Sequence, residues 1–232
     1  LSENNAKVIK LASIDTSNYQ FCEYIASKRI PVIASTGMTN YEQMNIVWNI
    51  FRDANCPMMF LHCTSAYPSP IEDKHLRCIP VMQQMFNSDI GFSGHAIGPE
   101  GTLGAVTLGA NVVEKHVSLS REMSGPDQAA SLEFHEFSKL VDMAQNIVSA
   151  LGLPRKKFLT SEEVLHGILA RKLVVVSKLN KGEIITKEML RTVVTKEEGG
   201  ILPDQYYNVV NSVANRNMEE NHILEIGDYK IG

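Results

Sequence analysis

The stretch from residue 58 to 117 decides the fold: MMFLHCTSAYPSPIEDKHLRCIPVMQQMFNSDIGFSGHAIGPEGTLGAVTLGANVVEKHV. It contains three short apolar runs, MFLHCT, IGFSGH and VVEKHV, with helix-like spacing of apolar residues between them. Two more runs, VIKLAS and PVIAST, precede it in the chain. Strand and helix units therefore alternate at intervals of roughly 20 to 27 residues from residue 8 to about 152, which is typical of a parallel sheet with helical crossovers.

Two closures of such a sheet differ in where polar residues are expected. An open doubly wound sheet has a glycine-rich phosphate turn after its first strand, and the sequence has none. A barrel instead places polar groups at the carboxyl ends of many strands. The five runs end in Ser13, in Ser35 and Thr36, in His62 and Thr64, in Ser93 and His95, and in Glu114 and His116.

The pattern favours an α/β fold containing a partial (β/α)8 TIM barrel, with about five of its eight strand-helix units. The sequence begins with Leu1 and enters a strand-like segment within a few residues. We therefore expect this sequence to lack the N-terminal part of the barrel.

The pattern of apolar and polar residues changes twice along the chain, which predicts three segments. We expect the barrel portion at 1–152, a polar linker at 153–168 that includes PRKKFLTSEEV, and a small, mostly β domain at 169–232. The last segment contains the β-branched run LVVVSKL, a turn at Lys181 and Gly182, and the apolar run EIIT.

Composition excludes several classes of protein. The net charge is -4 and no run of Lys and Arg stands out, so the sequence does not predict a nucleic-acid surface. No apolar run approaches the roughly 18 residues that a membrane span needs, and the opening is unlike a signal peptide. The four cysteines, Cys22, Cys56, Cys63 and Cys78, form no CxxC pair. We expect reduced thiols in a soluble, cytoplasmic protein.

His95 and His116 are the first candidates for a site, because each ends one of two neighbouring strands. In a parallel sheet they would lie about 4.8 Å apart, close enough to share a metal ion, or each would simply form a hydrogen bond at the rim. Lys10 would offer an ammonium to an anion or be an exposed lysine at a strand edge. The loop with Asp127 would bind a ligand or form a solvated turn.

The motifs HCTSAYP, SGH, EKH and GPD, in that order, closely resemble those of the sialic acid synthases, and KLNKGEIITKEML resembles their C-terminal antifreeze-like (SAF) domain. The resemblance covers essentially the whole chain. It implies condensation of phosphoenolpyruvate with an N-acetylmannosamine substrate, and a domain-swapped homodimer whose SAF domain caps a partner's site.

The same resemblance assigns roles to individual residues. It implies His95 and His116 as ligands of a divalent metal, manganese or magnesium, and Asp127 as a substrate-side group. The phosphoenolpyruvate contacts it implies are Lys10, Ser13, Ser35 and Ser93, and the sugar contacts are Ser65 and Tyr67.

Two departures refine these expectations. The family's catalytic carboxylate and a second phosphoenolpyruvate lysine belong to the N-terminal barrel portion, so no catalytic residue is assigned here. Val194 replaces an arginine of bacterial members, and SGH replaces SDH, as in the animal-type N-acylneuraminate-9-phosphate synthases. We therefore expect N-acetylmannosamine 6-phosphate as the substrate of the complete protein. The alternatives are a bacterial-type enzyme that uses the free sugar and a non-catalytic homologue, and we expect the chain by itself to be inactive.

Overall fold

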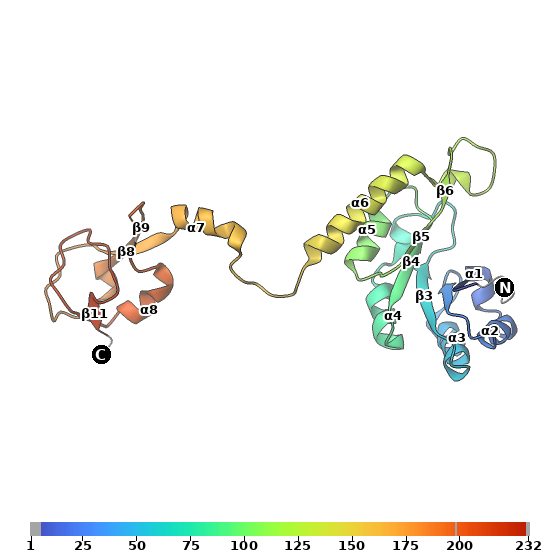
Figure 1. Ribbon diagram of the computed structural model, residues 1–232, viewed down its shortest axis with the longest axis horizontal. Helices are drawn as coiled ribbons and strands as arrows, with labels where there is room; N and C mark the ends of the chain where they lie inside the picture. The colour runs from blue at the N-terminus through green and yellow to red at the C-terminus, as the bar shows by residue number, and fades with distance from the viewer. Residues whose placement is uncertain (1–5, 198, 231–232) are drawn as a thin grey trace. The chain divides into compact units, whose positions relative to one another are not determined.

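The computed structural model describes residues 6–197 and 199–230. The chain divides into two compact units, Leu1–Leu153 and Pro154–Gly232 (Figure 1). Each unit has its own cluster of buried hydrophobic residues. They are described separately below.

The first unit is built on a five-stranded parallel sheet in which strands that are consecutive in the chain are neighbours. Its strands are β1 (Ile9–Leu11), β2 (Val32–Ser35), β3 (Met58–Cys63), β4 (Ile90–Gly94) and β5 (Val113–Lys115). The helices that connect or follow them are α1 (Ser13–Thr16), α2 (Tyr19–Ala26), α3 (Tyr41–Asp53), η1 (Glu72–Lys74), α4 (Cys78–Phe86) and α5 (Glu100–Thr107). The predicted five units are confirmed, and the sheet curls as part of a barrel does.

Alternation along each strand separates two faces of this sheet. Side chains such as Ile9, Val32, Phe60 and Phe92 face the helices and are buried in the core cluster. The residues between them in sequence face the opposite, concave side. The helix-facing positions supply the burial that holds the sheet, and the concave positions are free to carry polar groups.

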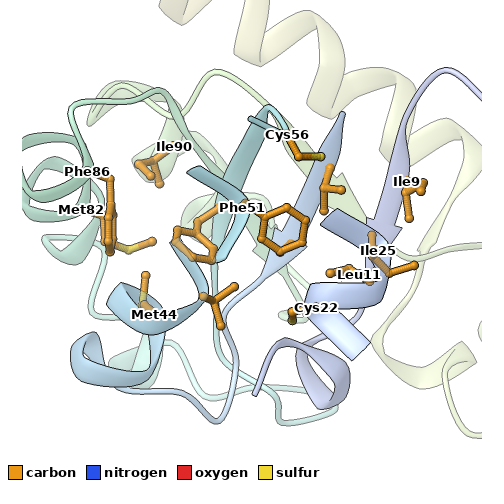
Figure 2. Packing of buried hydrophobic residues seen from close by; sticks show 14 of the residues in the cluster. Ile9, Leu11, Cys22, Ile25, Met44, Phe51, Cys56, Met82, Phe86 and Ile90 are labelled. Carbon is orange, nitrogen blue, oxygen red and sulfur yellow. The ribbon is translucent and has the colours of Figure 1, made fainter. Parts of the chain in front are cut away.

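The core of this unit lies between the sheet and its helices, where Phe51 of α3 is fully buried. Figure 2 shows Phe51 in the middle of the cluster, with Met82 and Phe86 of α4 on one side and Leu11 on the other. Asn40 begins α3 with a capping box: its side chain accepts from the Gln43 N–H, and the Gln43 side chain accepts from the Asn40 N–H, each at 2.9 Å.

After β5 the chain forms a loop, which hydrogen bonds and an ion pair hold in place, and then a long helix. The elements are β6 (Val117–Ser118), η2 (Gln128–Ala130), β7 (Leu132–Glu133) and α6 (Phe134–Leu151), and β6 pairs with β7. Arg121 in the loop forms an ion pair with Glu136 of α6. The Ser131 hydroxyl donates to the Asp127 carbonyl at 2.8 Å. These bonds hold the loop that carries Asp127.

The second unit contains short helices and two small antiparallel sheets, β8 with β9 and β10 with β11. Its elements are η3 (Thr160–Glu162), α7 (Glu163–Leu169), β8 (Arg171–Val175), η4 (Lys187–Met189), β9 (Leu190–Val194), η5 (Pro203–Gln205), α8 (Tyr206–Val209), β10 (Val213–Ala214) and β11 (Tyr229–Lys230). Gly182 has a φ of +90°, as the expected turn at that position requires.

Asp228 crosslinks the last segments of this unit. Its carboxylate is 4% exposed, lies 2.5 Å from Arg216 Nε and 2.7 Å from His222 Nε2, and accepts from the Glu225 N–H at 2.9 Å. Burial alone would raise the pKa of Asp228, but these three partners outweigh it and lower the pKa.

All four cysteines are free. Within residues 6–197 and 199–230, no helix combines the length and hydrophobicity that crossing a membrane would take.

Candidate active site

A carboxylate that joins three strands lies at the centre of the concave face. Glu114 Oε2 is 3.2 Å from Lys10 Nζ, and the Ser93 hydroxyl donates to Glu114 Oε1 at 2.8 Å. Ser93 and Glu114 are register partners on β4 and β5, so their contact follows from pairing. Lys10 and Glu114, however, belong to the two edge strands of the five. Their ion pair spans the concave side, as inward side chains of alternate barrel strands do.

Serine hydroxyls gather beside this carboxylate. Ser13 Oγ accepts from the Gly37 N–H at 3.0 Å. The hydroxyls of Ser35 and Ser65 are buried and have no hydrogen-bond partner among the described residues. A side chain at Gly37 would collide with the hydroxyls of Ser13 and Ser65, so glycine is required for the chain to pass this closely. Unpartnered buried hydroxyls are costly, and oxygen atoms of a ligand would satisfy them.

His95 and His116 lie next to one another at the ends of β4 and β5. Their ring centroids are 5.3 Å apart, and the Tyr67 ring lies 4.1 Å from the His95 ring and 5.6 Å from the His116 ring. His95 Nδ1 is 2.9 Å from the Thr64 carbonyl, so we assign the proton to Nδ1, which leaves the Nε2 lone pair for a ligand. His116 Nδ1 is 3.9 Å from Asp127 Oδ2.

This donor set fits a divalent metal ion held by two imidazoles. Imidazole is a common ligand of first-row metals, and a bond from the other ring nitrogen orients it. In the described part of the chain, no group of three or more His, Cys, Asp and Glu side chains is placed to hold an ion. The two histidines would therefore leave coordination positions for substrate or water.

Cys63 lies beneath His95 on the same face. Its Sγ is 3.9 Å from His95 Nδ1 and accepts a bond from the Ser13 hydroxyl at 3.6 Å. Burial raises the pKa of the Cys63 thiol, but the contacts with His95 and Ser13, together with the nearby Ser93, outweigh burial and lower the pKa. For His95, burial lowers the pKa, whereas Cys63 and the Thr64 carbonyl more than compensate and raise it. The concave side thus combines cationic, hydroxyl and imidazole groups within a few ångströms.

A family model described as the NeuB family matches residues 1–156, which is more than half of the chain. The chain belongs to the NeuB family. A second model, the SAF domain, matches residues 170–228. The resemblance to the sialic acid synthases and to their C-terminal domain is therefore confirmed.

Curated relatives of this NeuB chain are named for different products. N-acetylneuraminate-9-phosphate synthase of Homo sapiens is 37% identical over 225 residues, which are 97% of this chain and 62% of the relative. Pseudaminic acid synthase of Campylobacter jejuni is 33% identical over 95% of this chain and 64% of the relative. The chain thus spans less than two thirds of the length of these two relatives.

Solved structures support the family and the fold. Sialic acid synthetase from Leptospira borgpetersenii, in complex with citrate, is 32% identical with a TM-score of 0.67, covering 71% of this chain and 58% of that one. A DAHP synthase from Thermotoga maritima, at 16% identity and a TM-score of 0.56, covers 64% of this chain and 47% of that one. The second likeness concerns the fold alone.

The structure brings all nine residues expected of a NeuB site to one edge of the sheet. These are Lys10, Ser13, Ser35, Ser65, Tyr67, Ser93, His95, His116 and Asp127. Asp127 approaches only His116, and its side chain is half-exposed. The ligand roles of these residues stay predictions.

Two of the polar strand-end residues do not face the site. His62 is on the helix side of β3, and its Nε2 donates to the Lys74 carbonyl at 2.7 Å. The Thr64 hydroxyl donates to the Asp73 carbonyl at 2.9 Å, so both hold the following loop in place. The link of Glu114 to Lys10 depends on the curl of the sheet, which no local pattern in the sequence reveals.

Proposed function

We propose that this chain is the phosphoenolpyruvate-binding and metal-binding part of a sialic acid synthase that makes N-acetylneuraminate 9-phosphate and phosphate. The observation that carries the proposal is the gathering of Lys10, Ser13, Ser35 and Ser93 beside the histidine pair. Cationic and hydroxyl donors suit the carboxylate and phosphate of phosphoenolpyruvate. The paired imidazoles suit a metal that meets the sugar aldehyde.

Electrostatic positioning is the role we assign to the anion-binding groups. Lys10 would shift between Glu114 and the substrate anion, because its side chain is 36% exposed and its ammonium is already 3.2 Å from that carboxylate. The buried Ser35 hydroxyl, which lacks a partner among the described residues, would donate to a substrate oxygen. A site built on strand ends holds such donors rigidly and so reduces the entropic cost of orienting the substrate.

The reaction joins two carbon atoms and releases phosphate. C3 of phosphoenolpyruvate forms a bond to the aldehyde carbon of the sugar, water adds at C2, and the C–O bond to the phosphate breaks. A manganese or magnesium ion, when bound, would polarise and orient the aldehyde. On the sugar side we assign Ser65, Tyr67 and Asp127, which lie on the loops around His95 and His116.

N-acetylmannosamine 6-phosphate is the sugar substrate that we propose. Support comes from Val194, where bacterial members of the family have an arginine, and from the 37% identity to the human 9-phosphate synthase. The pseudaminic acid synthase at 33% identity favours an unphosphorylated or modified sugar as the second candidate. We further propose that the enzyme works as a cytoplasmic homodimer.

Phosphate release tests this function. A complete synthase that contains this chain is incubated with phosphoenolpyruvate and manganese, and N-acetylmannosamine or its 6-phosphate is supplied in parallel at equal concentration. We expect faster release with the 6-phosphate, loss of release in Lys10→Met, and no change in Lys139→Met, whose lysine is exposed on α6. Faster release with the free sugar would contradict the phosphorylated substrate. No release with either sugar would favour the non-catalytic alternative.

A further inference from the structure

Two lysines converge on the helix side of the sheet, behind the histidine pair. Lys74 of η1 is 3% exposed, and its ammonium donates to the carbonyl of Ser69 at 3.3 Å and to the Ser69 hydroxyl. Lys115 of β5 donates to the Ala96 carbonyl. The Ser69 N–H donates to the His95 carbonyl at 3.1 Å, which joins the two loops. Both ammonium groups therefore end at one loop junction.

Neither lysine forms an ion pair with an Asp or Glu side chain among the described residues. No Asp or Glu oxygen there lies within 4.0 Å of either ammonium nitrogen. Each ammonium has three N–H donors. The bonds described use two from Lys74 and one from Lys115. The two ammonium groups are held at directly bonded neighbours, because Ser69, which accepts from Lys74, donates to the His95 carbonyl, and Lys115 donates to the carbonyl of the next residue, Ala96.

A cavity of about 580 Å³ opens over the loop junction. It is lined by residues of both loops, among them Ser69 and Ala96, the two residues that hold the ammonium groups. A neighbouring cavity of about 780 Å³ is lined by Lys74. Glu100 lines both cavities and is the acidic residue of this surface.

We propose that Lys74 and Lys115 form a binding site for a phosphate group, carried by inorganic phosphate or by a phosphomonoester. A phosphate offers several acceptor oxygens to the unused donors and offsets the repulsion between the two ammonium groups. The site is separate from the phosphoenolpyruvate contacts, because Lys115 and its neighbours Glu114 and His116 point to opposite faces of β5. If the phosphomonoester is the 6-phosphate of the sugar, the inference rests on the proposed function and names a residue pair for its specificity.

Calorimetric titration of the full chain at constant ionic strength tests the proposal. All titrations use Lys10→Met as the background, which weakens phosphate binding at the phosphoenolpyruvate site. Inorganic phosphate should still bind, and Lys115→Met should weaken it at least about tenfold, the loss expected for a charge-assisted hydrogen bond. Lys115→Arg should retain binding, Lys139→Met should leave it unchanged, and Glu100→Gln should tighten it.

Two further titrants identify the source of the phosphate group. If Lys115→Met weakens the binding of N-acetylmannosamine 6-phosphate but not that of unphosphorylated N-acetylmannosamine, the site binds the phosphate group of the sugar. If Lys115→Met weakens only the binding of inorganic phosphate, the site binds the free anion. Both results support the proposal.

Equal phosphate binding in Lys10→Met with and without Lys115→Met would overturn the proposal, as would loss of all phosphate binding in Lys10→Met alone. Neither result touches the proposed function, which fails instead if Lys10→Met leaves phosphoenolpyruvate binding unchanged. Phosphate binding by Lys74→Met is interpreted only if the variant has the same thermal melt as the parent chain. The result for Lys115→Met tests the proposal even without that variant.

Discussion

Two substitutions of Glu114 should distinguish the stability contributions of its contacts with Lys10 and Ser93 on the concave face. Glu114→Gln keeps an oxygen that can accept from Ser93 but removes the charge that faces Lys10. Glu114→Ala removes both partners and leaves the hydroxyl of Ser93, which is 2% exposed, without its acceptor. The alanine variant should therefore be clearly less stable than the glutamine variant.

The magnitudes follow from burial. Lys10 and Glu114 have side chains 36% and 37% exposed, so solvent screens the pair, and its loss should cost about 0.5 kcal/mol. An unsatisfied buried hydroxyl costs about 1–3 kcal/mol. We expect the free energy of unfolding to fall by about 0.5 kcal/mol in Glu114→Gln and by about 2–3 kcal/mol in Glu114→Ala.

Urea unfolding followed by tryptophan fluorescence measures this difference. Trp48 is the single tryptophan of the chain and packs against both Phe60 and Phe86, so its signal reports on the first unit. Glu23→Ala, an exposed position on α2, is the control and should change stability by less than about 0.5 kcal/mol. Equal losses in Glu114→Gln and Glu114→Ala would refute the reasoning.

Three further changes test single contacts. Asn40→Ala removes the α3 capping box and should cost about 1 kcal/mol in the same urea assay. Burial lowers the pKa of His62 from its ordinary 6.5, against a smaller opposing effect of the Lys74 carbonyl. Unfolding therefore takes up a proton at His62 below that pH, so the stability of the parent should fall relative to that of His62→Gln from about pH 6.5 downward. Asp228→Ala strips Arg216 and His222 of their partner and should cost about 2 kcal/mol, seen as an earlier thermal melt of the second unit by circular dichroism.

The strands and their order could be predicted from the sequence because each strand contributes apolar side chains that pack under the helices. Each run ends in polar residues, and the carboxyl ends of parallel strands meet at one edge of the sheet. Ser93 and Glu114 could also be placed together, since adjacent parallel strands keep a fixed register. These are local or nearest-neighbour properties of the chain.

Contacts across the curled sheet could not be predicted in this way. The Lys10–Glu114 pair depends on how strongly five strands curl, and curvature is the sum of many small twists. Lys74 reads as a loop lysine, although the structure buries it under the junction of two loops. His62 does lie at the end of its strand, and counting by twos from the buried Phe60 puts it on the helix side, away from the site.

Binding of phosphoenolpyruvate to the chain tests the central claim most directly, because it needs no turnover. Calorimetric titration should show binding in the parent, at least about tenfold weaker binding in Lys10→Met and in Ser35→Ala, and an unchanged affinity in Lys139→Met. Absence of binding in the parent, or equal affinity in all four proteins, would contradict the assignment of the concave edge as the phosphoenolpyruvate site.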